Sequence, residues 1–392
     1  MRYIWITGAR VVEADRVTEP QDVLIENGRI AAIGHDLPVP ESAERIDGTG
    51  KYLLPAFVEL HAHGGGGADF ADGTKAAAER VFQTHLSHGV TLLCPTMLTS
   101  DWRDTMDFLR LCDGELSHHF MFGGVHLEGP FLNPIMCGAQ NRDLLISPTE
   151  SRVAELSELS HVISRITVAP ELEGTEVLAR EMTRRGVGLS VGHSNADAPT
   201  MEQAAAWGFT AVTHLYSSTS RRAKQGSYVI GGIEECALLD DRFTVELIGD
   251  GHHVCRESFL LTERCKGRDG IVLVSDAMRA AGQGVEITES YLGASVPENR
   301  VLIEDGVAKL TDRSSFAGSV AVGDTMVAAL CGSYGLPLPT VSHMMSAVPS
   351  HLLGLRDRGS IAVGMQAELV LLNDAYQTVA VLSGGEKVYE VV

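Results

Sequence analysis

Residues 57–70 read FVELHAHGGGGADF: an apolar run, two histidines separated by one residue, and four consecutive glycines. Side chains two positions apart on a β-strand point to the same side, so His61 and His63 can reach one metal ion together. The glycines at 64–67 carry no side chain and would leave room for backbone and substrate to approach. Two incidental histidines are the alternative, because the chain has 15 of them. The pattern predicts a metal-binding strand end.

This run is the first of eight apolar runs that alternate with helical patterns, such as APTMEQAAAWG at 198–208. Eight strands with intervening helices are typical of a (β/α)8 barrel, so we expect an α/β fold with a TIM-like barrel. An open doubly wound sheet also alternates, but no glycine-rich nucleotide fingerprint follows the first strand. The apolar runs end near Leu60, Cys94, Leu127, Val168, Val191, Val212, Ile248 and Ser275.

Both ends of the chain have a different character. The segments YIWIT, DVLIENGRIAAIG and KYLLP near the start, and AELVLLN and TVAVLSGGEKVYEV near the end, are short strand-like runs separated by turn signals. We therefore expect residues 1–55 and 356–392 to form one small β-sandwich domain, and residues 56–355 to form the barrel.

Composition limits the function classes. The net charge of −20 argues against nucleic acid and against an anionic membrane surface as partners, because both require a basic face. No run approaches the roughly 18 apolar residues of a membrane span. Seven scattered cysteines and a charged N-terminal segment without an apolar leader core indicate reduced thiols in the cytoplasm.

Metal-ligand residue types recur where the predicted strands end, which is where barrel enzymes build their active sites. Glu128 is a strand-end carboxylate that could bridge two metals, although it could also be a turn residue before Gly-Pro. Asp276 follows a buried strand and is expected to be the general acid/base, because a buried carboxylate needs a partner. His126 could support the site from behind. The candidate ligands are His61, His63, Glu128, His193 and His214.

Together these motifs resemble the amidohydrolase superfamily and, within it, the N-acetylglucosamine-6-phosphate deacetylases. The resemblance covers essentially the whole chain and rests on PAFVELHAHG, HLEGPFLNP, GHSNA, THLY, DGHHV, VSDAM and FAGS. It implies that His61 and His63 bind one divalent metal and that Glu128 bridges to a second, held by His193 and His214. Zinc is expected first, with iron, manganese, cobalt and nickel as alternatives. A carboxylated lysine bridge is not available, because no lysine lies between 75 and 224.

The resemblance also implies a substrate site, and here the chain departs from the family. Gln140 stands where the family commonly has histidine, and Ser217 and Ser218 replace Asn-Ala. The family's phosphate-binding arginine segment, often shared across a dimer, is not recognisable. The basic stretch containing Arg221 and Arg222 could bind an anion or be a solvated loop, and a homodimer is expected. The expected substrate contacts are Gln140, Ser217, Ser218, Arg221, Arg222, His253, Met278, Phe316, Ala317 and Gly318.

The resemblance implies hydrolysis of an N-acetylated amino-sugar phosphate to acetate and the amino-sugar phosphate. A metal-activated water would attack the amide carbonyl, and Asp276 would pass the water's proton to the departing amine. Another N-acyl sugar, an N-acyl amino acid or a cyclic amide remain alternative substrates. A non-catalytic barrel protein is disfavoured because every expected ligand and Asp276 are present.

Overall fold

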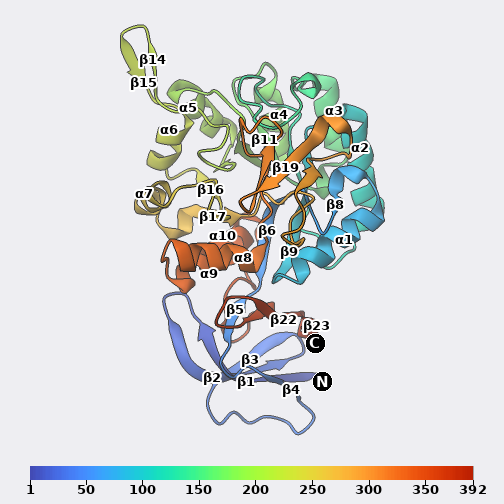
Figure 1. Ribbon diagram of the computed structural model, residues 1–392, viewed down its shortest axis with the longest axis vertical. Helices are drawn as coiled ribbons and strands as arrows, with labels where there is room; N and C mark the ends of the chain where they lie inside the picture. The colour runs from blue at the N-terminus through green and yellow to red at the C-terminus, as the bar shows by residue number, and fades with distance from the viewer. Residues whose placement is uncertain (392) are drawn as a thin grey trace.

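One of the two main sheets in the computed structural model, which describes residues 1–391, is a barrel of eight parallel strands (Figure 1). The hydrogen-bonded order is β17-β16-β13-β12-β11-β10-β9-β6, so the strands follow one another in chain order. Nearly every strand residue is buried, as expected for parallel strands covered on both faces. The strands are β6 (Phe57–Ala62), β9 (Val90–Leu98), β10 (Val125–Glu128), β11 (Ile163–Val168), β12 (Gly188–Val191), β13 (Ala211–Val212), β16 (Thr244–Ile248) and β17 (Ile271–Val274).

A helix follows each barrel strand, which confirms the predicted α/β barrel. β9 is longer than predicted: it continues to Leu98, because the apolar run resumes after Pro95 in extended conformation. The helices are α1 (Lys75–Leu86), α2 (Trp102–Leu111), α3 (Glu150–Glu158), α4 (Thr175–Arg184), α5 (Ala198–Trp207), α6 (Ile233–Leu239), α7 (Arg256–Lys266) and α8 (Gly323–Ala328), followed by α9 (Leu338–Met345) and α10 (Ala347–Leu352).

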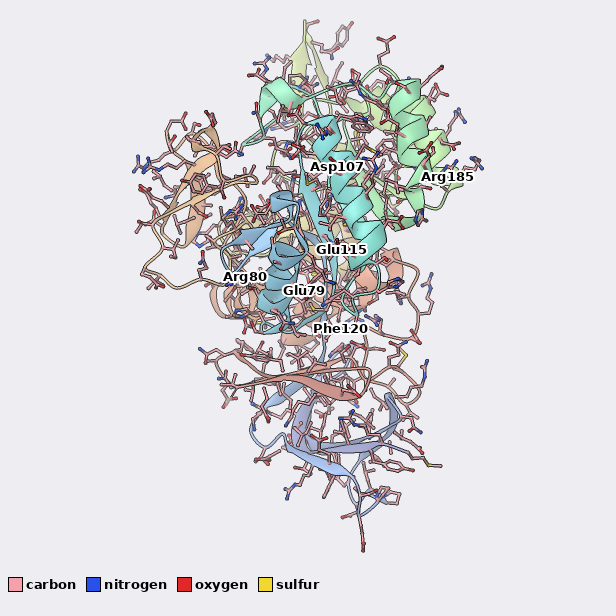
Figure 2. All side chains as sticks on the ribbon, turned by 90° about the vertical axis from the view of Figure 1, so that its right-hand side faces the viewer. Glu79, Arg80, Asp107, Glu115, Phe120 and Arg185 are labelled. Carbon is pink, nitrogen blue, oxygen red and sulfur yellow. The ribbon has the colours of Figure 1, made fainter. Side chains whose placement is uncertain are left out.

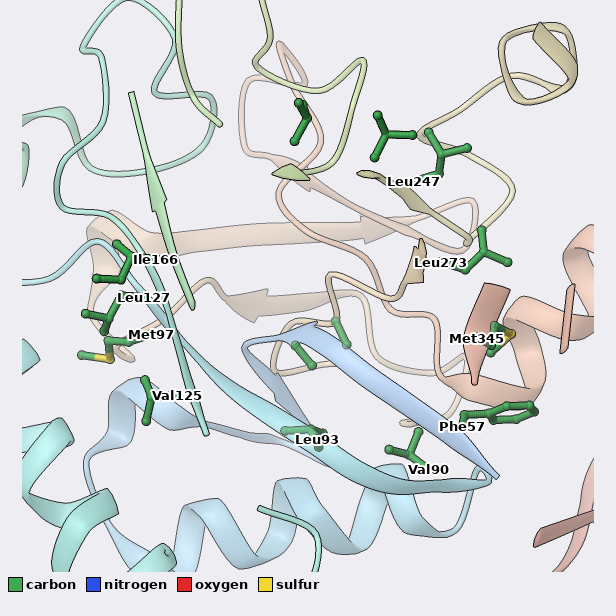
Figure 3. Close-up of a cluster of buried hydrophobic side chains, with 14 of the residues drawn as sticks. Phe57, Val90, Leu93, Met97, Val125, Leu127, Ile166, Leu247, Leu273 and Met345 are labelled. Carbon is green, nitrogen blue, oxygen red and sulfur yellow. The ribbon is translucent and has the colours of Figure 1, made fainter. Parts of the chain in front are cut away.

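Amphipathic helices cover the barrel. Side chains such as Leu93, Leu127 and Ile166 from neighbouring strands belong to one large buried cluster, part of which Figure 3 shows. Helix residues complete the same cluster. The outward faces of the helices carry charges, among them Arg80 on α1 and Asp107 on α2 (Figure 2). This division of apolar and charged faces fixes how each helix lies on the barrel.

A buried carboxylate lies at the seam where β6 and β17 meet. Glu59 in β6 accepts hydrogen bonds from the backbone N–H of His61 at 2.9 Å and of Ser275 at 3.0 Å. Beyond it, the N–H of Asp276 donates to the carbonyl of His61 at 2.9 Å, and Ala62 pairs with Ala277. Burial raises the pKa of Glu59 to about 7. The seam therefore holds the two strand ends at a fixed separation.

Both chain ends contribute to a second sheet, which lies below the barrel in Figure 1. Its order is β23-β22-β21-β5-β1-β2-β3, and β4 pairs with the first half of β1. Ile6, Val23 and Leu369 belong to a buried cluster of its own. The strands are β1 (Tyr3–Val12), β2 (Val17–Glu26), β3 (Arg29–Gly34), β4 (Glu44–Asp47), β5 (Tyr52–Pro55), β21 (Leu369–Leu372), β22 (Thr378–Ser383) and β23 (Glu386–Glu390).

Three smaller groups of paired strands lie in the loops that follow barrel strands β6, β13 and β17. β7 (Gly64–Gly65) pairs with β8 (Ala68–Asp69), and the hairpin β14 (Ala223–Gln225) and β15 (Tyr228–Ile230) projects from the body in Figure 1. A three-stranded sheet of β18 (Glu289–Tyr291), β19 (Arg300–Glu304) and β20 (Val307–Leu310) lies between β17 and α8 in the chain. Within residues 1–391, none of the helices has the length and apolar character needed to cross a bilayer.

Candidate metal centre

Six buried side chains converge where five barrel strands end. Three of them, His193, His214 and Asp276, stand two residues after their strands and have positive φ angles of 45°, 30° and 48°. This conformation is uncommon outside glycine, and it marks a sharp turn that directs each side chain over the end of the barrel. The six are His61, His63, Glu128, His193, His214 and Asp276.

The Glu128 carboxylate lies between two pairs of imidazoles. Its Oε1 is 2.9 Å from Nε2 of His193 and 2.8 Å from Nε2 of His214. Its Oε2 faces Nε2 of His63 at 3.3 Å, and that nitrogen is 3.3 Å from Nε2 of His61. The ligand atoms of His61, His63 and Glu128 lie within 4.8 Å of one another. The same holds for the ligand atoms of Glu128, His193 and His214. One carboxylate is therefore shared by two candidate metal positions.

Hydrogen bonds made by Nδ1 of His63 and of His193 determine that Nε2 of each ring faces the site. Nδ1 of His63 lies 3.3 Å from the carbonyl oxygen of Thr96, and Nδ1 of His193 lies 2.9 Å from that of Met136. A carbonyl oxygen only accepts, so each Nδ1 carries the hydrogen and each Nε2 can direct a lone pair inward. Such Nε2 lone pairs would repel one another and the nearby carboxylates. Cations bound between them would remove this repulsion. The donor set fits divalent transition metals, which imidazole and carboxylate ligands bind.

The charges of the cluster shift the pKa values of its members strongly. Burial alone would lower the pKa of His63, but hydrogen bonds to Asp276 and Glu128 raise it to about 9. Burial opposes the charged form of His61 as well, yet the same two carboxylates raise its pKa well above the usual value. Burial would raise the pKa of Glu128, whereas His61 and His193 hold it well below its usual range. The centre therefore favours positive charge between its carboxylates.

A cavity of about 270 Å³ opens over these residues, and Asp276 forms part of its wall. The Oδ1 atom of Asp276 is 3.2 Å from Nε2 of His63 and 3.4 Å from Nε2 of His61. Burial would raise the pKa of Asp276, but these two imidazoles lower it, so the charged form of the carboxylate is favoured. Among the predicted substrate contacts, the cavity is lined by Gln140, Ser217, Ser218, His253, Phe316 and Gly318.

The other four predicted contacts lie elsewhere. Met278 and Ala317 are fully buried in an apolar cluster that also contains Leu98, a residue of the cavity wall. Arg221 and Arg222 are exposed on the stretch that leads into the β14–β15 hairpin, outside the cavity lining.

The glycine run shows the close approach of backbone that was predicted for it, but it does not line the cavity. Residues 64–67 do not line the cavity. A Cβ atom on Gly64 would lie 2.5 Å from the carbonyl oxygen of Ala68 and 2.8 Å from the backbone nitrogen of Arg279. Gly64 therefore allows close packing of backbones beside His63, whereas the cavity lining gives no support to the expected contact with substrate.

Sequence reasoning missed Glu246, which lies in β16 with its Oε2 3.4 Å from Nδ1 of His61. It forms a buried ion pair with Arg165. The available signal was an acid inside the apolar segment TVELI, because a buried carboxylate needs a partner. His126 packs edge-on against His61 and bonds Thr167 through Nε2 at 2.8 Å, so it supports the ligand from behind.

Comparison with known proteins agrees with this geometry. A sequence model described as "Amidohydrolase family" matches residues 52–392. N-acetylglucosamine-6-phosphate deacetylase of Lysinibacillus sphaericus is 30% identical over 375 residues, covering 94% of this chain and 93% of that protein. The human protein of the same name is 28% identical over 399 residues, covering 99% and 91%.

Solved structures of proteins with the same name are also similar to this chain. N-acetylglucosamine-6-phosphate deacetylase from Pasteurella multocida has a TM-score of 0.90 at 26% identity, covering 98% of this chain and 99% of that chain. The Mycobacterium smegmatis enzyme, solved as a mutant in complex with N-acetyl-D-glucosamine-6-phosphate, has a TM-score of 0.86 at 26% identity, with 99% of both chains covered.

Proposed function

The chain belongs to the amidohydrolase family, and from this premise we propose that it hydrolyses the N-acetyl group of N-acetylglucosamine 6-phosphate. The products are acetate and glucosamine 6-phosphate. The observation that carries the proposal is the convergence of four imidazoles and two carboxylates at one end of the barrel, where all of them except His61 line one cavity. The relatives named for this activity match the chain over nearly its full length.

We propose that the centre holds two divalent ions, with zinc as the first expectation. His61 and His63 would hold one ion, His193 and His214 the other, and Glu128 would lie between them. Such ions lower the pKa of water towards about 7 and polarise an amide carbonyl.

Asp276 is the proposed proton carrier. Its carboxylate is ionised in the folded protein, because neighbouring imidazoles lower its pKa. It lies in the cavity wall, where it can take a proton from the attacking water and deliver it to the departing amine nitrogen. Its backbone N–H is bonded to the carbonyl of His61 at 2.9 Å, which keeps the carboxylate in place during both transfers.

The phosphate end of the substrate is assigned to the wall formed by His253, Ser217 and Ser218. Nδ1 of His253 is bonded to Asp250 at 2.7 Å, so its Nε2 would donate to an anion when the ring carries a hydrogen on both nitrogens. The ring of Phe316 packs 4.8 Å from that of His253 and limits its rotation.

We propose a homodimer in which each subunit supplies a positively charged side chain to the cavity of the other. Among the described residues, neither lysine nor arginine lines the cavity. Arg222 lies just before the projecting β14–β15 hairpin, whose tip exposes Tyr228 and Val229 (Figure 1). Exposed apolar side chains on a projecting arm are typical of a contact surface. We propose that the arm packs on a second copy and brings Arg222 to that copy's phosphate.

Two further assignments follow from the same observations. Residues 1–55 and 356–392 are proposed as one domain and 56–355 as the other, because one buried cluster consists only of residues from the two chain ends. A cytoplasmic location is proposed because all seven cysteines are free.

The activity is tested by measuring bound metal and then acetate release from four sugars. These are N-acetylglucosamine 6-phosphate, its galacto epimer and the two unphosphorylated sugars. We expect metal in protein prepared without chelators and fastest turnover of the phosphorylated gluco substrate. Metal-loaded protein that releases acetate from none of them would contradict the proposal and direct attention to other N-acyl compounds or cyclic amides.

The dimer is tested by sedimentation and by kinetics of Arg222→Ala. Losing a charge-assisted hydrogen bond of about 1.5 kcal/mol should raise KM for the phosphorylated sugar about tenfold. Arg103→Ala, on the exposed face of α2, is the matched control and should leave KM unchanged. A monomer in solution, or an unchanged KM for Arg222→Ala, would contradict this assignment.

A further inference from the structure

Gln140 makes more specific contacts than a residue that only lines a cavity. It is buried in the loop after β10, although no regular element holds it there. Its Oε1 accepts a hydrogen bond from the backbone N–H of Thr99 at 3.0 Å, and its Nε2 donates to Oε2 of Glu128 at 2.7 Å. The amide cannot be reversed, because its nitrogen would then face another N–H and its oxygen would face a carboxylate.

The bond from Gln140 adds a directional constraint to a carboxylate that also contacts three imidazoles. The terminal torsion of a glutamate side chain is broad and has no sharp minima. Yet the two oxygens of Glu128 must point in different directions, one towards His193 and His214 and the other towards His63. The amide nitrogen of Gln140 bonds Oε2 of Glu128 and not Oε1, and it also lies 3.4 Å from Nε2 of His193, so it selects one rotation of the carboxylate.

We propose that Gln140 is a positioning residue that locks the Glu128 carboxylate between the two metal positions, with Thr99 as its anchor. The inference rests on the proposed metal-dependent function and assigns Gln140 a task other than contact with the sugar. Hydrogen-bonded partners behind metal ligands commonly change metal affinity 10- to 100-fold, and this is the effect expected here.

The test is Gln140→Met, which keeps the size of the side chain and removes the amide. Cobalt(II) is titrated into chelator-treated protein, with its visible absorption recording both affinity and ligand geometry. We expect cobalt affinity to fall about tenfold or more and the absorption bands to shift. In metal-saturated protein, kcat should fall while KM for N-acetylglucosamine 6-phosphate changes little.

Ser217→Ala is the matched control, because Ser217 lines the same cavity without a bond to the metal ligands through its side chain. It should leave the cobalt titration unchanged. Gln140→Asn provides a second test should the methionine variant fail to fold. It retains the amide but is one methylene too short to reach Thr99 and Glu128 together, so it should also bind cobalt weakly.

Wild-type cobalt affinity and spectrum in either folded variant, with a raised KM, would overturn the proposal and make Gln140 a substrate contact. The cobalt readout does not depend on the substrate. A wild-type protein that fails to release acetate would therefore contradict the proposed function, and the effect of Gln140 on metal binding would still be decided.

Discussion

At the scale of single residues, the centre depends on backbone conformations that few side chains adopt. His193, His214 and Asp276 have positive φ, which costs of order 1 kcal/mol or more at each position. Aspartate and asparagine tolerate this region better than most residues. Substitutions at Asp276 should therefore be chosen to keep the backbone unstrained, so that the chemistry alone changes.

Asp276→Asn is the residue-scale prediction. The amide fits the same space and φ angle but cannot accept a proton, so turnover should fall by a factor of about 10² to 10⁴ or more. Metal content should stay near that of the wild type, because His61, His63 and Glu128 remain. Acetate release and metal analysis on the same preparation check both expectations. Loss of bound metal together with activity would show instead that Asp276 is chiefly a ligand.

The sequence predicts most of the metal centre and little of its support. His61, His193 and Asp276 were predicted because strand ends of a barrel converge on one rim, whatever the intervening loops do. Glu246 and Thr99 escaped notice because their partners lie far along the chain, and no local spacing reports such contacts. Gln140 was predicted as a substrate contact, but its bond to Glu128 depends on a loop path that no periodicity determines.

At the scale of elements, α1 is tied to the glycine run by a buried histidine. His85 near the end of α1 has its Nε2 3.1 Å from the carbonyl oxygen of Gly64, which requires the hydrogen on that nitrogen. Burial lowers the pKa of His85 to about 4. The neutral imidazole therefore holds the start of the loop that follows His63.

His85 should make stability sensitive to mild acid. The unfolded chain binds a proton below about pH 6.5, whereas the folded chain binds it only below about pH 4, so stability is lost between these values. Between pH 7.5 and 5.5 the free energy of unfolding should fall about 1 kcal/mol more in the wild type than in His85→Gln. Urea unfolding of both proteins at the two pH values measures this difference. Equal losses would show that His85 is not buried in neutral form.

At the scale of the whole molecule, one carboxylate joins the barrel to the terminal sheet. Asp324 at the start of α8 is bonded to Nδ1 of His88 at 2.8 Å and accepts from the N–H of Thr378 in β22 at 2.9 Å. Burial would raise the pKa of Asp324, but His88 lowers it. The contact fixes the start of β22, next to the edge strand β23, against α8 of the barrel.

Asp324→Ala should weaken this junction. Leaving a buried N–H unpaired costs about 1–3 kcal/mol, so the melting temperature should fall and amides of residues 378–383 should exchange hydrogen faster. Asp374→Ala removes an exposed ion pair with Arg10 and is the matched control, with a change below about 1 kcal/mol. Unchanged exchange in β22 would mean that the apolar contacts alone hold the two sheets together.

The convergence of imidazole nitrogens on Glu128 and Asp276 has a consequence for the way the protein exchanges protons with its buffer. With its pKa raised to about 9, the ring of His63 carries an extra proton near neutral pH when no metal is bound, and the raised pKa of His61 favours the same state. An incoming ion must displace these protons, so binding should acidify the solution and tighten as pH rises towards 9. Calorimetric titration with zinc in buffers of different ionisation enthalpy will measure the release. A heat that is the same in every buffer would show that the rings are already neutral before the metal arrives.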